Sequence, residues 1–142
     1  MRYAETRTGK AVKLEGREIT PLPANHTVPA VGYRIDSGNS SLVFSGDTTV
    51  CDDLWKAVNK IRNLRYLIIE TAFSKRERQL AVASKHLCPD MLKEELFKLQ
   101  REAEIYITHL KPGQIELTMQ EIEEFIGEYK PRMLQNNQVF DL

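Results

Sequence analysis

Five side chains of this sequence are of types that bind metals or move protons, and they are far apart in the chain: His26, Asp47, Glu70, His86 and His109. Neutral imidazoles and carboxylates are good ligands for zinc and similar metals, and one carboxylate can bridge two cations. Two histidines and one aspartate are too few for two metals, so such a site would need about two or three further ligands.

Each of these residues also has an ordinary structural interpretation. A lone histidine in a loop is usually a solvated surface residue. Gly46-Asp47-Thr48 places a carboxylate at the tip of a hydrophobic strand, beside a glycine that lets other groups approach closely. The same aspartate could equally serve as a turn or helix cap.

Glu70 follows a continuous apolar run, where an unpaired charge is costly. A partner is therefore expected, and His86 is one candidate. A carboxylate behind an imidazole fixes the tautomer and raises the pKa of the ring, which makes it a better proton donor. The alternative partner is one of the nearby arginines or lysines, and the sequence leaves both open.

Strands and helices alternate along the chain and would position these groups. Strands are expected at 11–14 and 17–19 (a hairpin), 31–35, 42–44, 65–69 and 104–108, with a possible last strand at 138–140, and Pro21 and Pro23 are expected to stop regular pairing. Helices are expected over 54–61, 76–84, 89–99 and 115–125. This order indicates an α/β layer with at least partly parallel pairing.

Four of the five candidate residues, all except His86, sit just past the end of an expected strand. Strand ends lie side by side in a sheet, so groups distant in the sequence can converge there.

Composition excludes several classes of function. Twenty basic and twenty acidic residues cancel, which gives no electrostatic footprint for nucleic acid or an anionic membrane. Apolar runs such as 66–69 are far too short to cross a bilayer. Cys51 and Cys88 form no CxxC pair, so we expect no disulfide framework and a cytoplasmic location.

Five short motifs, spread between about Ile19 and Glu123, resemble those of the metallo-β-lactamase superfamily. Residues 25–33 and 45–48 look like its third and fourth motifs, and residues 107–112 are similar to its last histidine motif. Residues 69–73 and 84–89 resemble the class II cyclic-nucleotide phosphodiesterases, and also the tRNA 3′-processing endonucleases of the same superfamily.

The resemblance implies an α/β fold, the second αβ half of an αββα sandwich. His26 would bind a first metal, Asp47 would bridge both metals, and His109 would bind the second. Glu70 and His86 would form a relay in which His86 protonates the leaving oxygen. Two divalent cations, zinc or alternatively manganese, would supply the attacking hydroxide and make the phosphorus more electrophilic.

The sequence departs from the family pattern in two respects. Lys85 stands where glycine is expected, and Cys88 where threonine is expected, which puts the substrate in doubt. In addition, the HxHxDH motif of the superfamily lies upstream of these motifs, and no histidine precedes His26. Residues 1–142 are therefore expected to form one partial domain that binds metal weakly and is inactive alone. The other half would come from a second chain, a longer precursor or a homo-oligomer partner, and without it an apolar sheet face would be exposed.

Three functions remain. The first is a metal-dependent hydrolase of a small phosphodiester, a cyclic nucleotide above all. The second is an RNA-processing or other hydrolase of the same fold, although the zero net charge and the lack of a lysine-rich arm argue against RNA. The third is a non-catalytic remnant or interaction module.

Overall fold

The computed structural model describes residues 5–142, which form an α/β structure around one seven-stranded sheet in the order β1 to β7. The strands are β1 (Val12–Leu14), β2 (Arg17–Pro23), β3 (Val31–Asp36), β4 (Ser41–Phe44), β5 (Leu64–Glu70), β6 (Glu104–Thr108) and β7 (Arg132–Met133). The helices are α1 (Asp52–Val58), η1 (Lys75–Glu77), α2 (Arg78–Ser84), α3 (Pro89–Leu96), α4 (Ile115–Ile126) and η2 (Gly127–Tyr129).

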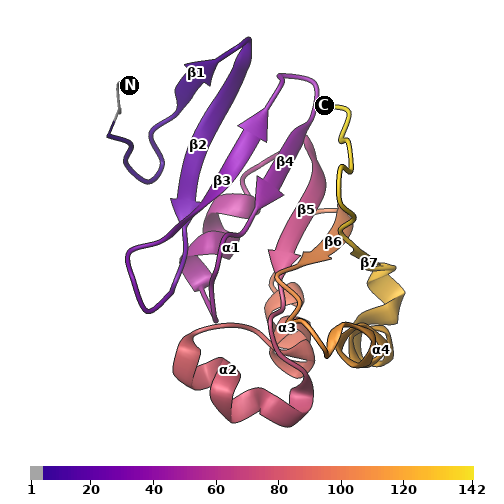
Figure 1. Cartoon of the computed structure of the whole chain (residues 1–142). Helices are drawn as coiled ribbons and strands as arrows, with labels where there is room; N and C mark the ends of the chain where they lie inside the picture. The colour runs from indigo at the N-terminus through magenta and orange to yellow at the C-terminus, as the bar shows by residue number, and fades with distance from the viewer. Residues whose placement is uncertain (1–4) are drawn as a thin grey trace.

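The sheet is antiparallel in its first half and parallel in its second (Figure 1). Strands β1 to β4 are joined by turns and loops, whereas β4 to β7 are joined through helices, as parallel pairing requires. The expected fold class, with partly parallel pairing, is confirmed, and so is the hairpin between β1 and β2.

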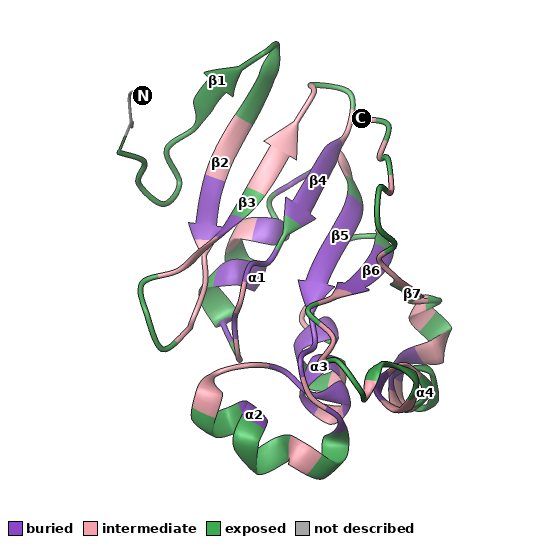
Figure 2. Ribbon diagram, in the orientation of Figure 1, coloured by how far each residue is buried: buried purple, intermediate pink, exposed green. Residues whose placement is uncertain are grey.

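One face of the sheet packs against α1, α3 and α4. Strand side chains on this face, such as Val43, Leu67 and Ile107, are completely buried, and so are Leu92 of α3 and Ile122 of α4. Each buried side chain of this size contributes about 1.5–3 kcal/mol. This face is the main hydrophobic core, and the strands that border it carry the buried colour in Figure 2.

The opposite face carries no helix in the described residues and is covered only in part. Leu42, Tyr66 and Tyr106 are buried beneath the carboxy-terminal segment, whose Phe140 packs edge-on against both tyrosine rings. Towards β1 the same face is open. Val12, Leu14, Tyr33 and Phe44, which the strand register places on this face, are 42%, 56%, 36% and 37% exposed. The expected exposure of an apolar sheet face is therefore present at β1, at Tyr33 of β3 and at the Phe44 end of β4, and absent around Leu42, Tyr66 and Tyr106.

The two prolines of β2 do not stop its pairing, contrary to the sequence prediction. Pairing with β3 continues through Pro23, which lies opposite Val31. The carbonyl of Pro21 accepts a hydrogen bond from Gly9 on the side away from β3, so the missing proline N–H also faces that side. Proline is tolerated there because that edge needs no ladder donor.

The prediction of a last strand at 138–140 is wrong. These residues have no regular structure, and the last strand is the short β7, paired in parallel with β6. Phe140 is used for packing against Tyr66 and Tyr106 rather than for backbone pairing. Separately, no helix within residues 5–142 has the length and apolar character needed to cross a membrane.

Candidate metal centre

The five candidate side chains come together at one end of the sheet. His26 lies in the loop between β2 and β3, Asp47 follows β4, and Glu70 is the last residue of β5. His86 follows α2, and His109 follows β6. The sequence placed Glu70 just past its strand, whereas in the structure it still pairs with Thr108.

Two glycines allow these loops to approach one another. Gly46 has a φ of +63°, and a Cβ there would lie 2.6 Å from the carbonyl oxygen of Val31. A Cβ on Gly32 would lie 2.6 Å from the carbonyl oxygen of Phe44. Because side chains at these positions would collide with backbone, only glycine lets the Asp47 turn pack against the start of β3.

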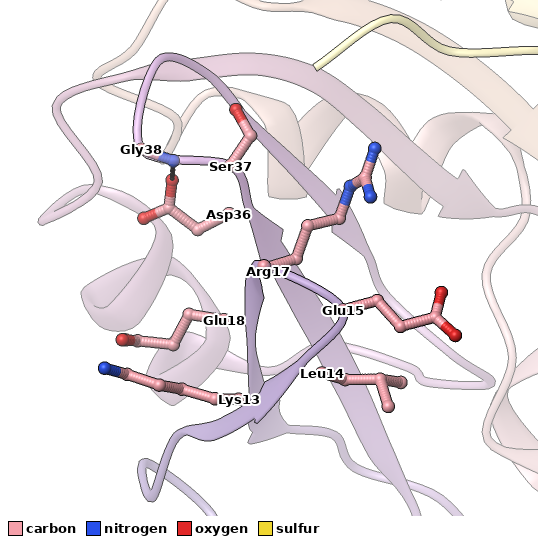
Figure 3. A pocket seen from close by; sticks show the side chains of 9 residues that line it. Lys13, Leu14, Glu15, Arg17, Glu18, Asp36, Ser37 and Gly38 are labelled. Atoms are coloured by element: carbon pink, nitrogen blue, oxygen red, sulfur yellow. Dashed lines mark hydrogen bonds between the residues drawn. The ribbon is translucent and has the colours of Figure 1, made fainter.

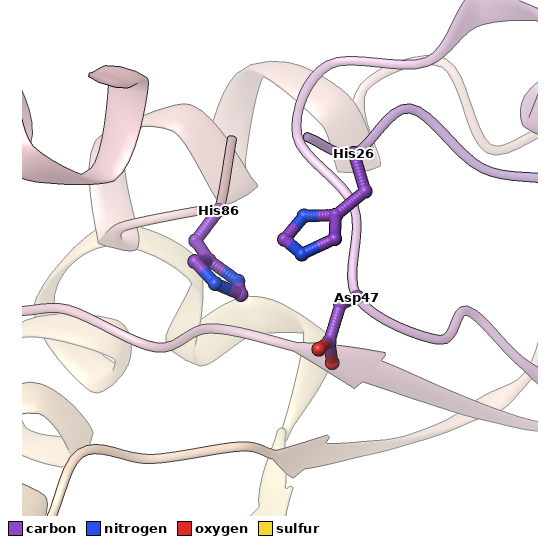
Figure 4. Close-up of side chains that lie close together, drawn as sticks. All are labelled: His26, Asp47 and His86. Atoms are coloured by element: carbon purple, nitrogen blue, oxygen red, sulfur yellow. The ribbon is translucent and has the colours of Figure 1, made fainter. Parts of the chain in front are cut away.

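His26, Asp47 and His86 point towards a common centre from three different segments (Figure 4). One ligand atom of each residue lies within 4.8 Å of the others. The two imidazole rings are 4.9 Å apart between centroids. This spacing is compatible with one divalent cation held between the three groups.

Both of these imidazoles are held by a hydrogen bond at Nδ1. The Nδ1 atom of His26 lies 3.1 Å from the carbonyl oxygen of Lys85, and that of His86 lies 2.7 Å from Oε1 of Glu70. A carbonyl or carboxylate acceptor behind the ring is the usual arrangement in metal-binding histidines, because it fixes the tautomer with Nε2 free. The donor set therefore fits a divalent metal.

His109 stands at the rim of the cluster. Its ring stacks on that of His86 with centroids 5.0 Å apart, and its Nδ1 lies 3.2 Å from Oδ1 of Asp47. The residue has a φ of +63°, a left-handed conformation that is uncommon for histidine. The structure thus brings all three histidines to Asp47 or to one another, with His86 in contact with both His26 and His109.

Glu70 connects the loops around the site. Its carboxylate accepts hydrogen bonds from the backbone N–H groups of Thr48, Ala72 and Leu87, and it contacts His86. The side chain is completely buried. Of the two partners left open by the sequence, His86 is the one that the structure provides.

Burial shifts the pKa values of this pair towards its uncharged forms. Desolvation raises the pKa of Glu70 to about 7, although the N–H groups of Thr48 and Leu87 act in the opposite direction. Desolvation also lowers the pKa of His86, and the nearby His26 lowers it further. Burial therefore disfavours the charged forms of both side chains relative to an exposed pair.

Lys85 has a positioning role that the sequence did not reveal. Its Nζ donates to Oδ1 of Asn25 at 3.1 Å and to the carbonyl oxygen of His26 at 3.3 Å. Asn25 is in turn held by Thr48 and by Val50. Lys85 thus joins the His26 loop to the His86 turn, and the only sequence signal was the departure from the expected glycine.

A hollow of about 430 Å³ lies at the other end of the strands, between the β1–β2 hairpin and the β3–β4 turn (Figure 3). It is lined by charged side chains such as Lys13, Arg17 and Glu18, and the amide of Gly38 donates to Asp36 within it. None of the five candidate residues lines it, so it is separate from the candidate metal centre.

Comparison with known proteins relates the chain to one superfamily. A family model described as a beta-lactamase superfamily domain matches residues 1–128. No curated protein matches the sequence significantly.

Solved structures with the same fold have low sequence identity to this chain. The metallo-beta-lactamase fold protein YhfI from Bacillus subtilis aligns with a TM-score of 0.75 and 19% identity over 95% of this chain and 54% of its own. A diphosphatase from the PhnP family aligns with a TM-score of 0.64 and 20% identity over 94% of this chain and 47% of its own. Zn(2+)-bound PqqB from Methylobacterium extorquens aligns with a TM-score of 0.62 and 15% identity over 96% of this chain and 51% of its own. The chain thus has their fold and spans about half of their length.

Proposed function

The chain belongs to the β-lactamase superfamily, and from that premise we propose that it carries part of a two-metal site that hydrolyses small phosphodiesters, cyclic nucleotides above all. The expected superfamily resemblance is thereby confirmed. The diphosphatase from the PhnP family and the zinc-bound PqqB, which share the fold, are compatible with this proposal.

One observation carries the proposal: the convergence of three imidazoles on Asp47 at the end of a buried sheet. A surface aspartate used only as a turn residue would have no reason to face three histidines. In addition, the Nδ1 atoms of His26 and His86 each face an oxygen acceptor, as is typical of histidines in metal sites.

Each side chain has a proposed role. His26 would hold one cation, Asp47 would be shared between the two, and His109 would hold the other. Zinc is the best fit to imidazole and carboxylate ligands, and manganese is the alternative. Cations bound here would act as Lewis acids towards the phosphoryl group.

His86 is proposed to be the general acid. In its protonated form the His86 ring donates Nδ1–H to Glu70 and presents Nε2–H to the leaving oxygen of the ester. When the P–O bond breaks, this proton moves from Nε2 to the departing oxygen, and the imidazole is left neutral. Glu70 positions the ring throughout and keeps its tautomer.

Two cations need more ligands than these residues offer. We propose that the remaining ligands come from an amino-terminal half-domain with the HxHxDH motif, as part of a longer polypeptide or as a separate chain. That half-domain would also cover the open sheet face around Tyr33 and Phe44.

The complete protein, loaded with zinc or manganese, would be assayed against cyclic AMP and bis-p-nitrophenyl phosphate. Hydrolysis is expected, and it should be unaffected by Asp53→Ala, which removes an exposed carboxylate of α1. If the protein binds metal stoichiometrically but hydrolyses neither ester, the phosphodiesterase proposal is wrong. If it binds no metal at all, the non-catalytic interpretation applies.

The role of His86 needs its own test, because its ligand atom lies as close to Asp47 and His26 as a metal ligand would. A general acid matters most for poor leaving groups. His86→Gln should therefore slow hydrolysis of an alkyl ester about 100-fold or more, and that of a p-nitrophenyl ester much less, with metal content unchanged. Loss of metal instead would identify His86 as a ligand.

A further inference from the structure

A second hollow, of about 320 Å³, opens directly beside the candidate metal centre. His86 and His109 form the wall next to the centre, and the remainder is formed by Ala72, Phe73, Leu110, Lys111 and Pro112. Its volume lies at the small end of the range for ligand pockets, about 300–1,000 Å³, which suits a group of one or two rings.

The hollow is apolar away from the imidazoles. The Phe73 ring stands edge-on to that of His86, with centroids 5.8 Å apart. The Nζ of Lys111 lies 5.1 Å from the centre of the Phe73 ring, but it is paired with Glu77 at 2.9 Å. A bound group would therefore meet an aromatic ring and aliphatic carbon, because the ammonium group already has its counter-ion.

The position of His86 sets which part of a substrate enters the hollow. As the proposed general acid, His86 must touch the oxygen that leaves. The hollow borders His86 and is not lined by His26, whose ring is 4.9 Å from that of His86, so it offers a place for the group attached to that oxygen.

We infer that this hollow is the leaving-group subsite, and that it selects esters whose leaving group carries an aromatic or apolar ring. The inference rests on the proposed function and adds a substrate class to it. Phe73 is the specificity-determining residue, since aromatic pairs in edge-on or offset geometry add stabilisation beyond simple burial.

Binding can be tested without turnover. Phenyl phosphate and methyl phosphate would be titrated into the zinc-loaded protein and followed by amide chemical shifts. The phenyl ester is expected to bind about tenfold more tightly, with the largest shifts at Phe73 and Leu110. Equal affinity for the two esters, or shifts confined to other parts of the protein, would overturn the inference.

The variant Phe73→Ala should reduce the preference for the phenyl ester to less than about threefold. Phe97→Ala is the matched control, because Phe97 is 66% exposed on the surface next to α3, and it should keep the full preference. Equal effects of the two substitutions would contradict the inference. If Phe73→Ala does not fold, Phe73→Leu keeps the apolar volume, removes the ring and should still lower the preference.

A third probe separates this inference from the proposed function. Phenol carries no phosphate, so it should shift the same amides in metal-free protein, and it should not do so in Phe73→Leu. If phenol binds at Phe73 but the protein neither binds metal nor hydrolyses esters, the hollow is a binding site for rings and the phosphodiesterase proposal is wrong. If the protein hydrolyses phosphodiesters without a preference for ring-bearing leaving groups, the phosphodiesterase proposal stands and the subsite inference is wrong.

Discussion

Two carboxylate–imidazole pairs lie at the same end of the sheet, and they differ in burial and in length. Glu70 and His86 are 2.7 Å apart, with 0% and 13% of their side chains exposed. Asp47 and His109 are 3.2 Å apart, with 41% and 44% exposed. The same two functional groups are therefore held in very different surroundings.

The difference indicates a division of labour. The buried pair is fixed by backbone donors and can position a proton, but little of its carboxylate remains free for a cation. The exposed pair is weakly held, because solvent screens charges at the surface. Its carboxylate is therefore available to bind metal. Four predictions test this contrast, beginning with the largest effect.

Glu70→Ala should be the most destabilising substitution at the site. It would leave three backbone N–H groups and the Nδ1 of His86 without their buried acceptor. We expect the free energy of unfolding to fall by about 3–5 kcal/mol, measured by chemical denaturation of metal-free protein. A loss below about 1 kcal/mol would show that solvent readily replaces Glu70. The buried pair would then contribute no more to stability than the exposed pair of Asp47 and His109.

Asp47→Ala should abolish metal binding and spare the fold. Loss of a mere supporting partner costs about 10–100-fold in metal affinity, so loss of a ligand should cost more than about 100-fold. The free energy of unfolding should change by less than about 0.5 kcal/mol. Zinc competition against a chromophoric chelator measures the first quantity. Wild-type zinc affinity in this variant would show that Asp47 is not a metal ligand.

The buried pair should also give the protein a pH-dependent stability. Burial raises the pKa of Glu70 from 4.5 to about 7, so between these values the folded protein keeps a proton that the unfolded chain has lost. The stability of the wild type relative to Glu70→Gln should therefore fall as the pH rises from about 4.5 to 7 and be constant above that. The total change should be up to about 3 kcal/mol.

Denaturation of both proteins across this pH range provides the measurement. His86 is present in both, so its own lowered pKa largely cancels in the difference. A stability difference that rises with pH would mean that Glu70 is held as a carboxylate, as in an ordinary ion pair.

His109→Ala should have the smallest effect on the fold. Its pairing with Asp47 is exposed, and exposed pairs contribute about 0–1 kcal/mol. Replacement of the left-handed histidine should change the free energy of unfolding by no more than about 0.5 kcal/mol in denaturant. A loss as large as that of Glu70→Ala would show that the rim residue supports the structure.

Local patterns in the sequence were sufficient for most of the fold. Strands β3 to β6 and helices α1, α3 and α4 follow from alternating or periodic apolar residues and from proline and acidic residues at helix starts, because these signals act within a few residues. The same reasoning placed His26, Asp47 and His109 in loops after strands, and so predicted that they could converge.

Other features depended on contacts between distant segments. The choice of His86 as the partner of Glu70, the Lys85 link to the His26 loop and the continuation of β2 through its prolines each join residues far apart in the chain. The use of Phe140 for packing rather than for a strand likewise depends on Tyr66 and Tyr106 beneath it.

The sequence by itself determined most of the elements and which side chains are chemically able to act, since both depend on residue types and their spacing. Tertiary structure alone decided which carboxylate is buried and which is exposed, because burial depends on what packs from elsewhere in the chain. That distinction separates a carboxylate that is buried against His86 from one that is open to solvent and available to a cation.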